Sequence, residues 1–368
     1  MHLSLNARFR TRPVTGVERF ASEVTKRLVS IADVDIHEIL PGSSLAGLKG
    51  HAWEQFVLPR KVDRDTVLFS PCNTGPISVH RQLVVIHDAA VWDCPDAFSR
   101  SFRTLYQNLL PALAKRAAGI ATVSEFSRLR LAKHLNISPE KIHVLGNASG
   151  PSFSLGSSEG VSEGVSEGSS EGSGRRDDPN SGPTLLCVGS LDPRKNIGRL
   201  IEAWIELSRS GRIPEGARLE IVGSAKPSNF SHFEMVDVPG IHWIGRVNDQ
   251  ELVQRYRNAD AFVFPSLYEG FGLPPLEAMA SGCPVLLSSE ASLPEVGGPA
   301  FDPADLDSAG AATYFDPRSV SEMASAIESM LNLDAAKRKR LTENALAHAS
   351  KFSWGKVAER TFLALESL

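Results

Sequence analysis

Two glutamates lie on either side of a turn-forming segment in the second half of the chain. Glu269 and Glu277 are separated by seven residues, GFGLPPL, within the stretch PSLYEGFGLPPLEAMASGCPV. Glycine lets the backbone turn tightly and approach a ligand closely, and paired prolines suit the start of a helix, where a missing N–H costs nothing. Carboxylates accept hydrogen bonds from hydroxyls, and a helix N-terminus attracts phosphate. The stretch therefore predicts a site that binds hydroxyls and an anionic group together.

The apolar run AFVFPS (261–266) directly precedes this stretch and is typical of a buried strand. YEGFG then emerges at the carboxyl end of a strand, where doubly wound folds bind ligands. We expect a helix over about residues 275–281 that stops at Gly282. Glu277, in the first turn of that helix, could simply stabilise the helix dipole. Glu269 lies outside the helix, so that explanation does not apply to it.

Two adjacent cations, Arg194 and Lys195, occupy a matching place after the run TLLCVGS (184–190) and before a helical pattern (197–210). Taken alone, they could belong to a solvated turn. Both loops leave the carboxyl ends of strands in one sheet, however, so both can face one crevice. Two cations and a helix N-terminus would hold a diphosphate and stabilise the charge that develops as it departs.

In the first half of the chain, VVIHD ends a strand with His87 and Asp88, and Gly16 precedes a helical pattern at 17–31. A histidine in this place could do no more than bond to a neighbouring loop. Asp88 could cap a following helix or orient His87. Gly16 would let a ligand approach the N-terminus of its helix closely.

Composition excludes several classes of protein. The 368 residues are 42% hydrophobic, enough for two domains with substantial cores, and the net charge of −4 with a pI near 6.2 leaves no basic excess for nucleic acid. The four cysteines have no metal-ligand spacing, which fits a reducing cytosol. The sequence MHLSLNARFR has no apolar signal-peptide core, and no run approaches the roughly 18 apolar residues of a membrane span. We expect a cytoplasmic protein.

Cofactor and metal motifs are missing from the sequence. It contains neither G-x-G-x-x-G after a strand nor G-x-x-x-x-G-K-[ST], the signatures of dinucleotide and P-loop sites. The acidic pairs in DVD (33–35) and DLD (305–307) are interpreted as chance. We expect no cofactor and no metal.

Strands and helices alternate along the chain, and the pattern restarts at residue 184. Continuous apolar strands between helices indicate an α/β fold with doubly wound parallel sheets, here one in residues 1–155 and one in 183–352. Between them, S-E-G recurs in a segment (156–182) too poor in apolar side chains to fold, which we interpret as a flexible linker or insertion rather than a calcium site. Further expected strands are 34–40, 66–70, 83–87, 120–124, 219–223 and 285–289, and further expected helices are 101–119, ending at Gly119, 125–135, 251–259 and 321–331.

These motifs resemble those of a known family, the retaining glycosyltransferases of the GT-B fold, family 4. Its most specific signature is E-x7-E with an internal GFGLP, here Glu269 to Glu277, and the resemblance covers nearly the whole chain outside the S-E-G segment. VGSLDPRKN, SLPEVGG (292–298), TVSEFSR (122–128) and IHD (86–88) also match. PRKN and SEFSR look most like mannosyltransferases that build bacterial O-antigens and other surface polysaccharides. The implied fold is two Rossmann-like domains that face a central cleft.

The resemblance implies roles for the residues that match the donor site. Lys195 matches a lysine that contacts the donor diphosphate, with Arg194 assisting it. Glu269 matches the glutamate at the donor sugar, and Glu277 the one that holds the nucleotide ribose. Backbone amides that line the diphosphate and sugar are matched by Gly270, Phe271, Gly272 and Leu273.

Other implied roles fall on the first domain, the acceptor side. His87 matches a histidine near the transferred sugar, and Gly16 lies in the loop that faces the donor phosphates and the acceptor. The C-terminal helix, 353–368, would pack back on this domain. The chain departs from the family pattern at Ser190, where many members have an arginine, so Arg194 must supply the second cation. Its N-terminal loop also has one glycine rather than a glycine-rich run.

The family mechanism needs neither a metal nor a protein nucleophile. The implied donor is a nucleotide sugar, with GDP-mannose favoured over UDP-glucose or a deoxysugar nucleotide, and the acceptor is a saccharide or lipid-linked saccharide at a membrane. A different interpretation is a non-catalytic subunit that binds nucleotide sugar; it is disfavoured because this chain keeps both Lys195 and Glu269. Residues 101–117 mix basic and apolar side chains, so peripheral membrane contact is considered there, but a helix packed on the first sheet is favoured.

Overall fold

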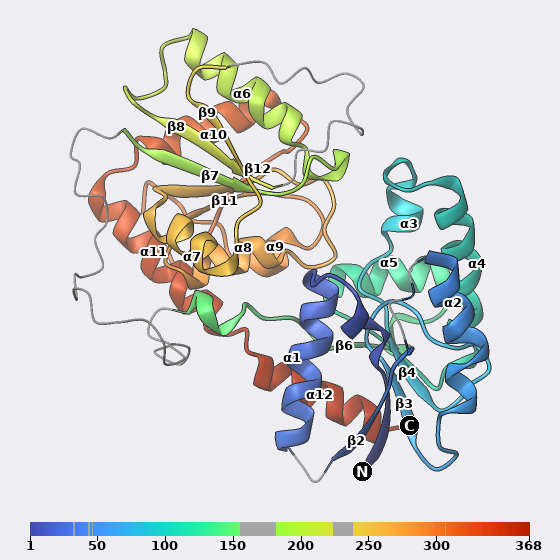
Figure 1. Ribbon diagram of the computed structural model, residues 1–368. Helices are drawn as coiled ribbons and strands as arrows, with labels where there is room; N and C mark the ends of the chain where they lie inside the picture. Colours follow the sequence, from blue (N-terminus) through green and yellow to red (C-terminus); the bar gives the residue numbers. More distant parts are fainter. Residues whose placement is uncertain (32–33, 43–44, 46, 155–181, 224–237, 306) are drawn as a thin grey trace, which may run out of the picture. The chain divides into compact units, whose positions relative to one another are not determined.

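The computed structural model (Figure 1) describes residues 1–368 apart from 32–33, 43–44, 46, 155–181, 224–237 and 306. Residues 156–181 of the S-E-G segment therefore lie outside the described residues, as do Asp33 and Leu306 of the two acidic pairs. The chain divides into two compact units. Unit 1 comprises Met1–Ala148, Glu269–Phe271 and Phe352–Leu368, and unit 2 comprises Ser149–Tyr268 and Gly272–Lys351. Residues 149–154, which the sequence placed with the first domain, thus belong to unit 2.

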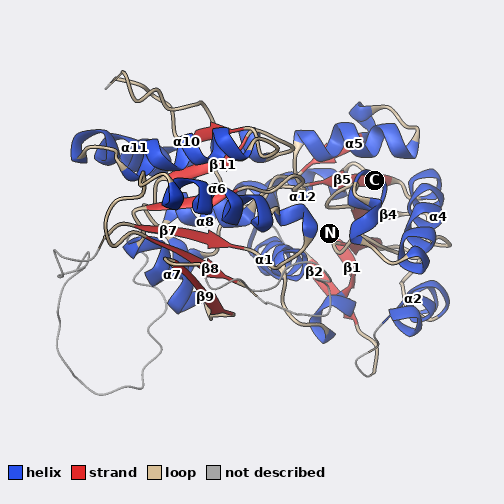
Figure 2. Ribbon diagram, turned by 90° about the horizontal axis from the view of Figure 1, so that it is seen from above, coloured by secondary structure: helices blue, strands red, loops and turns tan. Residues whose placement is uncertain are grey.

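Among the described residues of unit 1, six parallel strands form one sheet in the order β2-β1-β3-β4-β5-β6. Four of them, β1, β2, β4 and β5, are labelled in Figure 2. Strands β3, β4 and β5 are buried along their whole length, as expected of central strands covered on both faces. The strands are β1 (His2–Asn6), β2 (Asp35–Ile39), β3 (Val67–Ser70), β4 (Gln82–Val85), β5 (Gly119–Thr122) and β6 (Ile142–Val144).

Helices cover both faces of this sheet because successive residues of a strand point to opposite sides. Val84 of β4 packs with α4 and α5 through Leu110 and Leu131. On the opposite face, α12 packs against α1, and the rings of Phe20 and Trp354 are 6.1 Å apart. The helices are η1 (Ala7–Thr11), α1 (Gly16–Ile31), α2 (Gly47–Phe56), η2 (Leu58–Arg60), α3 (Ala90–Asp93), η3 (Pro95–Ala97), α4 (Arg100–Arg116), α5 (Glu125–Leu135), η4 (Pro139–Lys141) and α12 (Trp354–Glu366).

Unit 2 repeats the same plan. Its described residues form a second six-stranded parallel sheet in the order β12-β11-β10-β7-β8-β9. The strands are β7 (Thr184–Val188), β8 (Arg218–Val222), β9 (Ile241–Gly245), β10 (Ala261–Phe264), β11 (Val285–Ser288) and β12 (Thr313–Phe315). The helices are η5 (Pro151–Phe153), η6 (Pro193–Lys195), α6 (Ile197–Arg209), α7 (Asp249–Asn258), α8 (Leu273–Ala280), α9 (Leu293–Gly297), α10 (Val320–Leu331) and α11 (Ala335–Ala349).

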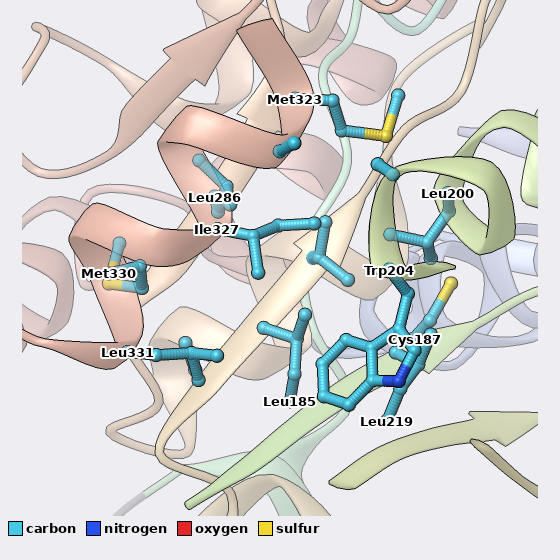
Figure 3. Packing of buried hydrophobic residues seen from close by; sticks show 14 of the residues in the cluster. Leu185, Cys187, Leu200, Trp204, Leu219, Leu286, Met323, Ile327, Met330 and Leu331 are labelled. Atoms are coloured by element: carbon cyan, nitrogen blue, oxygen red, sulfur yellow. The ribbon is translucent and has the colours of Figure 1, made fainter. Parts of the chain in front are cut away.

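The largest side chain in the core of unit 2 is Trp204 (Figure 3), which α6 places between the sheet and α10. It is 1% exposed and packs in one cluster with Leu185 and Leu219 of the sheet and Ile327 of α10. Helices α7 and α8 lie on the other side of the sheet (Figure 1), and α8 directly follows the carboxyl end of β10. The core therefore fixes the strands whose ends carry the predicted site.

Several expected helix boundaries differ from the observed ones by one to three residues. Helix α4 ends at Arg116, and Gly119 begins β5 instead of capping the helix. Gly119 pairs with Leu83 of β4, and a Cβ there would be 2.9 Å from Leu83 Cδ1, so the position belongs to the packed sheet. Helix α8 begins at Leu273 and ends at Ala280, ahead of the expected 275–281.

We expect Trp204→Ala to lower the free energy of unfolding of unit 2 by about 3–5 kcal/mol, because it removes a large buried side chain and leaves a cavity. Urea denaturation measures this change. Glu202→Ala on the same helix is the control: its side chain is exposed, so its effect should stay within about 0.5 kcal/mol. Equal losses in the two variants would contradict the packing described for α6.

Candidate functional site

The loop that carries the two predicted cations is fixed to the loop that follows β10. Strands β7 and β10 are adjacent and parallel, so both loops leave the same edge of the sheet in unit 2. The amide of Leu267 donates to the carbonyl of Arg194 at 2.8 Å. The side-chain amide of Asn196 donates to the carbonyl of Pro265 at 3.1 Å and to that of Pro317 at 2.7 Å. Hydrogen bonds thus hold the two loops side by side.

Lys195 lies over the carboxyl ends of these two strands. Its Nζ is 5.1 Å from the ring centroid of Phe264, the last residue of β10, a distance suited to a cation–π interaction. Its stem runs along Gly189, where an added Cβ would be 3.5 Å from Lys195 Cγ. Burial raises the pKa of Cys187 to about 12, whereas the positive charge of Lys195 acts to lower it. The Lys195 charge therefore lies close to Cys187, near the end of β7.

Arg194 is held differently, by the carboxylate of Asp192. Its Nη2 is 2.7 Å from Asp192 Oδ2, and its backbone amide donates to Oδ1 of the same carboxylate. Burial acts to raise the pKa of Asp192, but hydrogen bonds from Arg194 and its charge outweigh burial and hold that pKa below its ordinary value. The Arg194 charge is therefore offset by a neighbour, whereas Lys195 projects over an aromatic ring.

The helix after the signature turn is α8, and Glu277 is buried within it. Gly272 precedes the helix with φ of 111°, a conformation that L side chains rarely adopt. Glu277 is the fifth residue of α8, beyond the first turn, and is 7% exposed. It therefore does not lie where a carboxylate stabilises a helix dipole. Burial and the charge of Glu277 both raise the pKa of Tyr256 well above its ordinary value, so the carboxylate lies near that buried ring.

The first part of the signature turn, Glu269–Phe271, belongs to unit 1. A Cβ at Gly270 would be 2.7 Å from the carbonyl oxygen of His87 and 2.9 Å from Asp88 Cβ, so this close approach requires glycine. Phe271 is buried, and its ring meets that of Phe352 edge-on at 6.0 Å. Glu269 is half-buried and stands next to this tight contact. The structure thus brings the backbone beside Glu269 against the His87 backbone.

His87 is buried and neutral at pH 7. Its side chain is 6% exposed and contacts the edge of the Phe20 ring at 5.0 Å. Burial lowers the pKa of His87, against a hydrogen bond to Pro71 and the charges of Asp88 and Glu18 that act to raise it. Because the partner of Nε2 is the Pro71 carbonyl, 2.9 Å away, Nε2 carries the proton and Nδ1 is the acceptor.

The other two predicted positions in unit 1 have local structural roles. Asp88 accepts a hydrogen bond from the amide of Ala90 at 2.8 Å and so begins α3. Gly16 is the exposed first residue of α1. The preceding Thr15 donates its amide to the Glu18 carboxylate at 3.1 Å, which closes the first turn of the helix.

The predicted residues therefore fall into two groups. Unit 2 contains Arg194, Lys195, Gly272, Leu273 and Glu277, whereas unit 1 contains Gly16, His87, Glu269, Gly270 and Phe271. Reasoning from the residues missed Asn196, which joins the two loops of unit 2, and Ser124 and Ser127, whose hydroxyls contact Gly270. The SEFSR run was the only signal for the serines.

Neither a metal-binding cluster nor a membrane-spanning helix occurs in the part of the chain that the structure describes. There, no group of three or more His, Cys, Asp or Glu side chains is arranged to hold a metal ion. No described helix is long and apolar enough to cross a membrane.

Comparison with known sequences points to sugar transfer. Residues 173–348 match the family described as "Glycosyl transferases group 1". The chain is 26% identical over 392 aligned positions to an "O-antigen chain mannosyltransferase B" of Escherichia coli, and the alignment covers 97% of each protein. It is 31% identical over 278 positions to the "Serotype-specific mannosyltransferase WbdA" of Escherichia coli, with 72% of this chain and 30% of that protein aligned.

Comparison with solved structures identifies the fold. Sucrose-phosphate synthase from Thermosynechococcus elongatus superposes with a TM-score of 0.72 at 15% identity, covering 100% of this chain and 98% of that one. At this identity the likeness concerns the arrangement of the sheets and helices. It shows a GT-B fold, as the sequence predicted.

We expect the stability of unit 1 to fall as the pH drops below about 6.5, in part because of His87. Its pKa is lower in the folded protein than in the unfolded chain, so the unfolded chain binds the proton first and acid favours unfolding. In His87→Gln this contribution is lost, and the free energy of unfolding should decline less between pH 7.5 and pH 5.5 than in the wild type. Chemical denaturation across this range measures it.

His37→Gln is the matched control, since His37 is exposed in the same unit. It should follow the wild-type pH course. The same pH course in His87→Gln and the wild type would contradict the assignment of a buried, neutral His87.

Proposed function

We propose that this glycosyltransferase of the GT-B fold, whose residues 173–348 match the family "Glycosyl transferases group 1", moves a hexose, with mannose favoured, from a nucleotide sugar to a saccharide or lipid-linked saccharide. The product would enter a surface polysaccharide such as an O-antigen. The mannose preference rests on the names of the mannosyltransferases to which the chain is similar.

One observation carries this proposal: Lys195 lies at the edge of the unit 2 sheet where β7 and β10 end and where α8 follows. An ammonium group and free amides at a helix N-terminus both favour an anion. A donor diphosphate is the anion that a glycosyltransferase must bind. Arg194, paired with Asp192, would assist by adding guanidinium donors at the rim of the same loop.

The two glutamates would hold the uncharged ends of the donor. Glu277 is buried in α8 of unit 2, and a carboxylate suits the two ribose hydroxyls as a double acceptor. Glu269 would accept hydrogen bonds from hydroxyls of the transferred sugar. The amides of Gly270, Phe271, Gly272 and Leu273 would donate to the sugar and the diphosphate.

His87 would contribute without carrying charge. Its Nε2 proton is committed to the Pro71 carbonyl, so Nδ1 is the atom that could accept a bond from a sugar hydroxyl. A neutral ring also avoids placing a cation beside the anomeric carbon, where positive charge develops. Gly16 would line the acceptor side at the start of α1.

We propose a retaining mechanism that uses no metal or cofactor. The acceptor hydroxyl attacks the anomeric carbon on the face from which the nucleotide leaves, the bond to the diphosphate oxygen breaks, and that oxygen takes the hydroxyl proton. Lys195 and the α8 N-terminus stabilise the departing charge, which grows as the bond breaks. We place this reaction in the cytoplasm, with peripheral contact to the membrane that holds a lipid-linked acceptor.

A panel of nucleotide sugars tests the donor. We expect GDP-mannose to raise the thermal unfolding midpoint of the full chain more than UDP-glucose or a deoxysugar nucleotide at equal concentration, because a ligand that binds the folded state stabilises it by mass action. Lys195→Ala should abolish most of the increase. A larger shift with UDP-glucose would redirect the donor assignment, and no shift with any nucleotide sugar would contradict the proposal.

Catalysis is tested by nucleotide release in the presence of acceptor saccharides. We expect Lys195→Ala and Glu269→Ala each to lower kcat by about 10²- to 10³-fold, because each removes a group placed at the departing diphosphate or the sugar. Lys339→Ala, an exposed lysine of unit 2, is the matched control and should retain wild-type rates. Binding of donor with equal release in all variants would favour a non-catalytic binding subunit. Full activity in EDTA and an unchanged anomeric configuration in the product would agree with the metal-free, retaining mechanism.

A further inference from the structure

The carbonyl oxygen of Gly270, next to Glu269, accepts hydrogen bonds from two serine hydroxyls. Ser124 Oγ donates to it at 2.6 Å and Ser127 Oγ at 2.9 Å. Both serines are fully buried and belong to unit 1, as do Glu269 and Gly270. A carbonyl in a turn that faces solvent needs no hydrogen bond from a buried side chain, whereas this carbonyl receives two.

The same hydroxyls are tied into the first turn of α5. Ser124 Oγ also accepts from the amide of Ser127 at 3.0 Å and so caps the helix. An oxygen that accepts one hydrogen bond donates a stronger one, which favours its short bond to Gly270. Ser127 Oγ also lies 3.1 Å from the carbonyl oxygen of His87, so its single proton is shared between the Gly270 and His87 carbonyls.

This arrangement answers a difficulty created by Gly270 itself. Only glycine fits against the His87 carbonyl, because a Cβ would be 2.7 Å from that oxygen. Glycine, however, leaves the backbone on both sides free to rotate over a wide range. The orientation of the neighbouring Glu269 must then be fixed by hydrogen bonds rather than by sterics, and the two serines supply them.

We infer that Ser124 and Ser127 are positioning residues that fix the peptide beside Glu269, and through it the Glu269 carboxylate, against the backbone of His87. This inference rests on the proposed function, since it gives the serines their importance through the sugar-binding glutamate. Neither hydroxyl needs to touch the donor. Their loss should change turnover and the dynamics of the turn more than donor binding, because the cations proposed above to hold the diphosphate, Arg194 and Lys195, lie in unit 2.

The decisive variant is Ser124→Asp. Aspartate is as good a helix cap as serine, so α5 keeps its first turn, but an ionised carboxylate cannot donate and repels the Gly270 carbonyl. We expect kcat to fall about 10- to 100-fold with the KM for the donor changed less than threefold, a loss typical of a misplaced reacting group. Hydrogen exchange of peptides covering 265–276 should become faster. Ser124→Thr, which keeps the hydroxyl, should restore both properties.

If Ser124→Asp fails to fold, Ser127→Ala is a second test variant. We expect it to lower kcat about three- to tenfold. Ser99→Ala removes the cap of α4 and is the control for capping alone, with wild-type kcat expected. Wild-type kcat and unchanged exchange in Ser124→Asp, or in Ser127→Ala, while the wild type is active would overturn this inference. An inactive wild type with every donor would instead overturn the proposed function.

Discussion

The order of strands in the unit 2 sheet is the constraint on which the site depends. Because β10 lies between β7 and β11 and all three are parallel, the segments after β7 and β10 must leave the sheet at the same edge. This arrangement brings Lys195 close to the ring of Phe264, although the two residues are 69 positions apart in the chain. The hydrogen bond from Leu267 to Arg194 then turns this proximity into a fixed geometry.

Asn196 shows how a single residue secures that geometry. It adopts a left-handed conformation, with φ of 56°, that most side chains avoid and asparagine tolerates. Its side-chain amide donates to carbonyls after β10 and after β12, so one residue ends η6, begins α6 and joins three segments. An alanine here would rarely adopt this backbone conformation and would have no side-chain donor for the two carbonyls. The position of the neighbouring Lys195 is therefore set by the backbone rather than by its own flexible side chain.

Much of the fold could be predicted because buried parallel strands have continuous apolar sequences. AFVFPS and EFSRLRLAKHL gave β10 and α5 nearly residue for residue. The prediction overlooked β1, β6, β9 and β12. In β1 the short run HLSLN mixes polar and apolar residues. The prediction that Gly119 ends the preceding helix was wrong. Glycine is common at helix ends, but it also fits crowded strand positions, and here it lies in a strand beside Leu83. The contact of Ser124 with Gly270 spans 146 residues, and no local pattern specifies a contact at that separation.

Under the proposed function, the charges around η6 would stabilise the departing diphosphate without fully neutralising the intact donor. Arg194 and Asp192 offset each other, which leaves the charge of Lys195 and the partial charge of the α8 N-terminus, about half an elementary charge in a long helix. That is less positive charge than a free nucleoside diphosphate carries in negative charge. Since negative charge on the leaving oxygen grows as the glycosidic bond breaks, a limited number of cations interacts more strongly with the transition state than with the donor. Without the Asp192 carboxylate, Arg194 would bind both the donor and the spent nucleotide more tightly, so under the proposed function the pairing would favour turnover.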